Sequence, residues 1–96
     1  MKVKRYKSIE ELGKDLGVSP DRIGISRMKT KLRKRIIQEA EIKGLSAAEL
    51  SVISSLSRTV VSGILNGSLL SVSLERLIRL ASALDLSVEL NIKNAA

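Results

Sequence analysis

The chain has 96 residues and a formal net charge of +7, which indicates one small domain with a modest core and an affinity for polyanions. It contains no cysteine and no histidine, which excludes disulfides, thiolate chemistry, serine–histidine catalysis and the usual zinc sites. Only 1% of its residues are aromatic, so it lacks the stacking surface that binds single-stranded nucleic acid. We expect no catalytic activity, no cofactor and no metal ion.

The positive charge is concentrated near the N-terminus. Residues 1–35 contain twelve lysines and arginines and four acidic residues, whereas residues 36–96 contain five basic and six acidic residues. The densest block is residues 27–35 (RMKTKLRKR), where six of nine residues are basic. Such a block suits contact with nucleic acid phosphates, and the alternative is an ordinary solvated helix face.

Nothing in the sequence predicts a membrane or secretory segment. No run of apolar residues is long enough to span a membrane. The charged N-terminus is not followed by the apolar core of a secretory signal. We therefore expect a cytoplasmic protein without a membrane partner.

Residues 8–16 (SIEELGKDL) are predicted to form a short amphipathic helix. Ser8 and Glu11 have the spacing of a capping box. The apolar residues that follow share one side of the helix: Ile9, Leu12 and Leu16. Gly17 can end this helix.

The assignment of residues 17–27 stays open. Ser19 and Pro20 have the form of an N-cap followed by proline at the first helical position. Gly24 disfavours a helix through residues 20–30, by about 1 kcal/mol relative to alanine. We therefore divide the chain into residues 1–27, a basic segment that binds a partner or is partly flexible, and a folded domain at residues 28–93.

A longer helix is predicted for residues 28–43, and two short helices follow it. Leu32, Ile36 and Ala40 recur at helical spacing, and Gly44 with Leu45 has the form of a Schellman stop. A second capping box, SAAE at residues 46–49, opens a helix to residue 54 or 55.

The stretch LSRTVVSGILNG, residues 56–67, predicts the second short helix. Ser57 can cap its start, and Asn66 with Gly67 can end it. Two short helices joined by a tight turn have the layout of a helix-turn-helix. Small Ser51 suits the point where the two helices cross, and Val61 and Ile64 can anchor the second helix.

The C-terminal part combines a helix with a strand pattern. Ser73 can cap a helix that ends near Asp85, with an apolar stripe made of Leu74, Leu77, Ile78, Ala81 and Leu84. In SVELNIK, residues 87–93, apolar and polar residues alternate as in a strand with one buried face. Its partner is either residues 2–7 (KVKRYK) or the same strand of a second copy. We favour the second copy, which gives a two-fold dimer with an interface at Val88, Leu90 and Ile92.

These motifs resemble the Cro/repressor-type (XRE) helix-turn-helix family, and within it the small HigA-type antitoxin branch. The resemblance lies in LSAAELSVISSLSRTVVSGILNG and in the tail SLERLIRLASALDLSVELNI, and covers residues 32–93. It implies a mainly α, lambda-repressor-like domain of four to five helices with one C-terminal β-strand that pairs across a dimer. It further implies a cytoplasmic homodimer that binds a palindromic double-stranded DNA operator and represses transcription. The antitoxin branch adds autoregulation of its operon and neutralisation of a toxin encoded beside it.

The second short helix is the expected reading element, because the N-terminal residues of such helices enter the major groove. Arg58 can contact guanine with two hydrogen bonds, worth roughly 1–3 kcal/mol of discrimination. Further candidates for DNA contact are Ser57, Thr59, Ser62 and Asn66 on this helix and the helix start at Ser46 and Ala47. The basic block can flank the groove by contacting phosphates through Lys31, Arg35, Lys29, Arg33 and Lys34. The competing interpretations are helix capping for Ser57 and Asn66 and plain solvent exposure for Arg58, Thr59, Ser62 and the basic block.

Departures from the family pattern motivate a second hypothesis. The family usually carries glutamine at position 47 and long polar residues at 60 and 63, whereas this chain has Ala47, Val60 and Gly63. Family members also usually have alanine, an apolar residue and glycine at 51, 54 and 55, where this chain has serine. The alternative is therefore a degenerate helix-turn-helix that neutralises a toxin as a protein-interaction module, without specific DNA binding.

Overall fold

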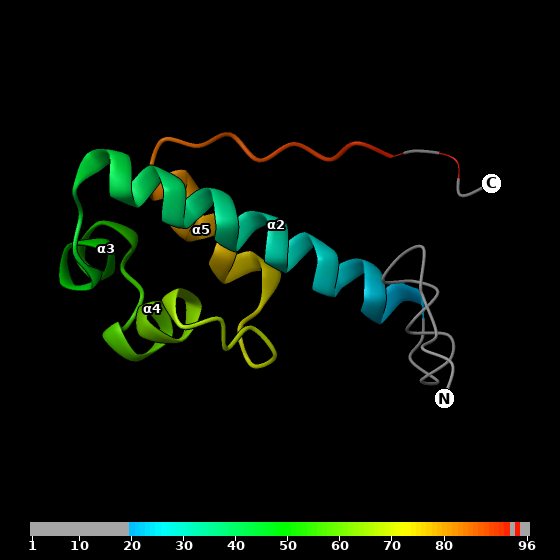
Figure 1. Cartoon of the computed structure of the whole chain (residues 1–96), viewed down its shortest axis with the longest axis horizontal. Coiled ribbons are helices and arrows are strands. Elements are labelled where there is room, and N and C mark those ends of the chain that lie inside the picture. Colours follow the sequence, from blue (N-terminus) through cyan, green and yellow to red (C-terminus); the bar gives the residue numbers. More distant parts are fainter. Residues whose placement is uncertain (1–19, 93, 95–96) are drawn as a thin grey trace, which may run out of the picture.

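The computed structural model describes residues 20–92 and Asn94, which form four helices and an extended C-terminal segment (Figure 1). The helices are α2 (Pro20–Lys43), α3 (Ala47–Ser54), α4 (Arg58–Leu65) and α5 (Leu74–Ala83). α2 packs on α5 and more lightly on α4, while α3 packs on both α4 and α5. Among the described residues, no helix is long and apolar enough to cross a membrane.

The core is built from aliphatic side chains that all four helices contribute. The predicted apolar stripes are largely confirmed, because Ile36, Val61 and Leu77 are fully buried. The remaining members of this core cluster are Ala40, Leu50, Leu56, Ile64, Val72, Leu80, Ala81 and Leu84. Val61 and Ile64 therefore anchor α4 in the core, and the opposite side of this short helix faces solvent.

The first described helix begins earlier than the periodicity predicts. α2 starts at Pro20 instead of Met28 and runs through Gly24 without a break. Proline suits the first helical position and Asp21 lies in the first turn, where an acidic residue interacts well with the helix dipole. A single glycine costs too little to end a helix of 24 residues. The predicted helix at residues 8–16 lies outside the described residues.

Both long helices end in Schellman motifs. At the end of α2, Gly44 has a φ of 64° and the N–H of Leu45 donates to the carbonyl of Ala40 at 3.0 Å, as predicted. At the end of α5 the left-handed position is Asp85, with a φ of 63°. Lys43 joins these two ends, because its Nζ donates to the carbonyl oxygen of Leu84 at 2.6 Å and to Oδ2 of Asp85 at 3.1 Å.

The predicted C-terminal strand does not form within the described residues. Residues 87–92 run as an extended segment alongside α2 and pair with no other described segment (Figure 1). A strand needs a partner for its backbone groups, and residues 2–7 lie outside the described part of the chain. Val88, Leu90 and Ile92 are 40%, 76% and 82% exposed, so the predicted interface residues are uncovered in the single chain.

Candidate nucleic-acid interface

The first short helix is capped as the sequence predicts. Ser46 Oγ accepts a hydrogen bond from the backbone N–H of Glu49 at 3.2 Å, and the Glu49 carboxylate accepts one from the N–H of Ser46 at 3.1 Å. Hydrogen bonds that the Glu49 carboxylate accepts from Ser46, first from its backbone N–H and second from its side chain, lower the pKa of this carboxyl below its ordinary value. The side chain of Ala47 packs against the core, so only the backbone of this residue is available for the predicted phosphate contact.

The turn between α3 and α4 is held together by serine hydroxyls. Ser51 Oγ donates to the carbonyl oxygen of Leu56 at 2.5 Å. Ser54 is buried, and its hydroxyl donates to the carbonyl of Leu50 at 2.6 Å and accepts from the N–H of Leu56 at 3.3 Å. Ser55 takes the left-handed conformation with a φ of 61°. The three serines that depart from the family pattern therefore supply the turn with its hydrogen bonds and its left-handed residue.

The second short helix divides cleanly between an inner and an outer side. Ser57 caps its start by accepting from the N–H of Val60 at 3.2 Å, and Val61 and Ile64 are fully buried. Val60 also packs against the core, which explains why a long polar side chain is missing there. The outward residues are Arg58, Thr59 and Asn66, which are exposed, and Ser62, which is half-buried.

The outward side of α4 carries short polar side chains and a single long, positively charged one. Arg58 is the only charged residue of the helix. Gly63 has room for a methyl group, because an added Cβ would make only an ordinary van der Waals contact with the carbonyl oxygen of Ser68, at 3.9 Å. The helix therefore presents one guanidinium and several short side chains to any surface that approaches it.

The C-terminal end of α4 is capped by Arg33, a residue of the basic block that we predicted to contact phosphate. Arg33 donates from Nε to the carbonyl of Ile64 at 2.7 Å and from Nη2 to the carbonyl of Leu65 at 2.6 Å. The guanidinium lies over Gly67, where an added Cβ would be 3.7–3.8 Å from it. Lys29 donates to the carbonyl of Leu69 at 3.0 Å. Cations are favourable at this end of a helix dipole, so Arg33 holds the end of α4 while Lys29 holds the loop that follows it.

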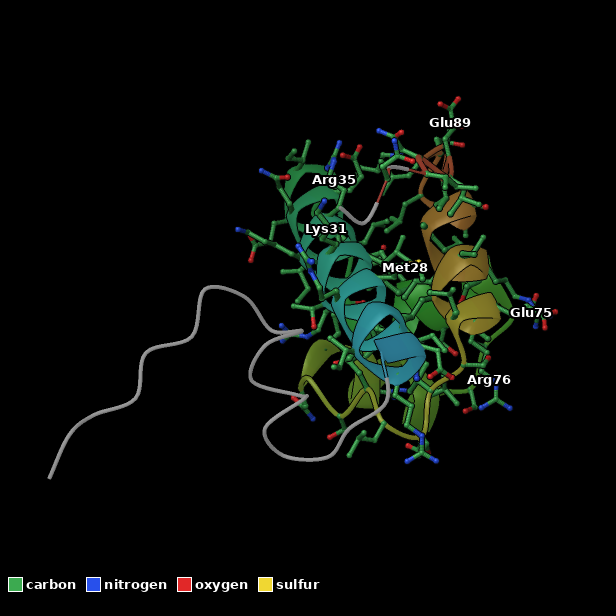
Figure 2. All side chains as sticks on the ribbon, turned by 90° about the vertical axis from the view of Figure 1, so that its right-hand side faces the viewer. Met28, Lys31, Arg35, Glu75, Arg76 and Glu89 are labelled. Atoms are coloured by element: carbon green, nitrogen blue, oxygen red, sulfur yellow. The ribbon has the colours of Figure 1, made fainter. Side chains whose placement is uncertain are left out.

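Two other cations of the block, Lys31 and Arg35, lie away from α4. Lys31 and Arg35 line a shallow groove with Leu32 and residues 86–89. Figure 2 shows both side chains on the same upper side of the molecule as Glu89. Arg35 also pairs with Glu39, with Nη1 and Oε2 2.9 Å apart. The structure thus brings the outward residues of α4 together but places Lys31 and Arg35 beside the C-terminal segment.

This arrangement is that of a helix-turn-helix DNA-binding domain. A capped first helix, a tight three-residue turn and a second helix with a free outer side are the parts that such a motif needs. A family model described as a helix-turn-helix domain matches residues 8–93, and the chain belongs to this family. No curated protein and no solved structure matches the chain. The protein is thus a DNA-binding helix-turn-helix protein.

Proposed function

We propose that the protein is a sequence-specific transcriptional repressor that places α4 in the major groove of its operator. The observation that carries the proposal is the outward side of α4. Arg58 and Thr59 are exposed there and Ser62 is half-buried, whereas the buried residues of the helix are Val61 and Ile64. The position of this helix is fixed by Val61 and by the two hydrogen bonds from Arg33. A rigidly held helix with a free polar side suits direct reading of base edges.

The proposed repressor acts as a homodimer on a palindromic operator. The C-terminal segment supports this, because its alternating apolar residues are exposed and its backbone has no strand partner among the described residues. Antiparallel pairing of this segment in two copies would cover Val88, Leu90 and Ile92. It would also relate the two copies of α4, the recognition helix, by a two-fold axis. Such dimers bind half-sites about one helical turn of DNA, roughly 34–36 Å, apart.

The finer role that we propose is the antitoxin of a toxin–antitoxin pair that represses its own operon in the cytoplasm. Support comes from the tail at residues 73–92, whose leucine spacing resembles the HigA-type branch. We expect a toxin-sized reading frame beside the gene, and we expect its product to co-purify with this chain after co-expression. An isolated gene without such a neighbour contradicts the antitoxin role and leaves the repressor proposal intact.

A second candidate function is a protein-interaction module that no longer reads DNA. Gly63 and Val60 favour the interaction module. Gly63 has no side chain and Val60 packs against the core, so Arg58 is the only long side chain on the outward side of α4. In that case residues 1–27 would bind the toxin, and the affinity for DNA would be weak and independent of the DNA sequence.

Binding to two DNA duplexes separates the two functions. One duplex carries the region upstream of the gene and the other a scrambled sequence of the same composition. Arg58→Ala should weaken binding to the first roughly 5- to 150-fold, the equivalent of 1–3 kcal/mol, with a much smaller loss on the second. The control is Arg79→Ala, which removes the same charge from an exposed position on α5 and should affect both duplexes slightly and equally. Wild-type affinity that is equal for both duplexes supports the interaction module.

A further inference from the structure

A shallow groove, called the C-terminal groove below, lies between α2, α5 and the extended segment at residues 87–92. Its apolar lining consists of Leu32, Ala81, Leu86 and Val88, and the exposed Lys31 and Arg35 add two cations. Leu90 and Ile92, the next apolar residues of the segment, are largely exposed. The apolar side of the segment therefore continues the lining of the groove and is left largely uncovered by the described residues.

We propose that this segment pairs with the same segment of a second copy in one register, centred on Leu90, and that the partner's Ile92 covers the C-terminal groove. The inference rests on the homodimer of the proposed function and adds the register of its interface. With the two-fold axis at Leu90, Val88 lies opposite the partner's Ile92. Directly opposite side chains of an antiparallel pair lie on the same side, with Cβ atoms about 4.5–5.5 Å apart. Because Val88 lines the groove, the partner's Ile92 lies over it.

The alternation of the segment excludes half of the possible registers. A two-fold axis midway between two residues places every apolar residue of residues 88–92 opposite a polar one. The pair would then have no apolar side to set against α2 and α5, because a shift of one residue moves the apolar set to the other side. The axis therefore passes through a residue.

The other axes that pass through a residue give poorer pairs than the central one. An axis at Glu89 places two carboxylates directly opposite each other, and like charges in this position are destabilising. An axis at or before Glu89 also brings Leu86 into the pairing, although this residue already packs against the core. An axis at Asn91 leaves Val88 opposite the partner's Asn94. The central axis alone pairs the three apolar residues exclusively with one another.

The C-terminal groove suits an apolar occupant from a second copy. Leu32 and Leu86 are half-buried, so contact with the partner's Ile92 removes apolar surface from water. Glu89 lies opposite the partner's Asn91 in this register, which separates the two carboxylates. The two-fold axis repeats each contact, so each copy completes the groove of the other.

Cysteine cross-linking of the full-length protein, without DNA, tests the register. The chain has no cysteine, so each introduced thiol is unique. Leu90→Cys should form a disulfide-linked dimer under mild oxidation, because the two thiols face each other at nearly the Cβ separation of a disulfide. Ser87→Cys is the matched control; its two copies are about 20 Å apart along the pair, so it should cross-link at least about tenfold more slowly. Val88→Cys and Ile92→Cys should cross-link to each other when mixed, and neither should cross-link alone.

Ile92→Lys tests the contact with the groove, because it places an ammonium beside Lys31 and Arg35. We expect the Kd of the dimer, measured by sedimentation equilibrium, to rise at least about 100-fold, since both grooves lose a buried isoleucine. Asn91→Lys is the matched control. It adds the same charge one residue away, opposite the partner's Glu89, and should change the Kd by less than about fivefold.

Three results would overturn the proposal. Faster cross-linking of Glu89→Cys or Asn91→Cys than of Leu90→Cys would show a different register. A dimer that is as stable in Ile92→Lys as in the wild-type protein would place the interface elsewhere. A wild-type protein that is monomeric at every concentration tested would remove the homodimer itself. DNA sequence preference is measured separately with Arg58→Ala, so failure of this register and failure of DNA reading are distinguishable.

Discussion

Replacement of Arg33 by methionine tests whether the basic block serves to hold α4 in place. Methionine keeps most of the apolar stem and removes the guanidinium that donates to the carbonyls of Ile64 and Leu65 at 2.7 and 2.6 Å. A hydrogen bond that involves a charged group contributes about 1.5–3 kcal/mol. The two carbonyls are only partly buried and recover some hydration, so we expect the free energy of unfolding to fall by about 2–3 kcal/mol.

Urea unfolding followed by far-UV circular dichroism measures this loss. Thermal unfolding gives a second measurement. In a domain of this size, a loss of 1 kcal/mol in the free energy of unfolding lowers the Tm by about 4–8 °C, so we expect the Tm to fall by about 10–20 °C. Arg33→Lys should recover only part of the loss, because an ammonium cannot reproduce the fork that spans both carbonyls. The matched control is Lys34→Met, which removes the same charge from the adjacent exposed position and should cost less than about 0.5 kcal/mol. Equal stability of Arg33→Met and Lys34→Met would refute the capping role.

Three further substitutions test the turn and the recognition helix by the same unfolding measurement. Ser54→Ala should lower the free energy of unfolding by about 1–3 kcal/mol, because it leaves the N–H of Leu56 without its buried acceptor; an unchanged value contradicts this role. Ser55→Gly should raise it by about 1 kcal/mol, since glycine adopts the left-handed conformation without steric cost, and a loss would mean that Ser55 contributes more than its backbone. Gly63→Ala should also raise it by about 1 kcal/mol, because alanine favours the helix and its methyl group makes only an ordinary contact with the carbonyl oxygen of Ser68; destabilisation would show that the site is more crowded than the structure indicates.

Local features of this fold were predictable from the sequence. The capping box at Ser46 and the Schellman stop at Gly44 depend on residues within one or two turns of each other. Helical spacing also identified Val61 and Ile64 as the inward residues of α4. Helical periodicity and capping depend on residues that are close together in the sequence, so they can be recognised without knowledge of the tertiary structure.

The contacts that position the candidate interface were not predictable in the same way. The hydrogen bond from Arg33 to Ile64 joins residues 31 positions apart, and nothing local distinguishes Arg33 from the other cations in its block. Lys31 and Arg35 were grouped with the DNA contacts by charge alone, yet they lie beside the C-terminal segment. The continuity of α2 from Pro20 to Met28 was left open because the cost of one glycine was weighed without the length of the helix around it.

Selection from a pool of duplexes with a randomised central region tests the central claim, that α4 reads DNA sequence. After several rounds with the full-length protein, we expect an inverted repeat whose half-sites are centred about one helical turn apart. The same selection with Arg58→Ala should lose preference at one position in each half-site, which would identify the base that this residue contacts. A pool that shows no enriched sequence, while the wild-type protein still binds every duplex, would contradict sequence-specific recognition by α4.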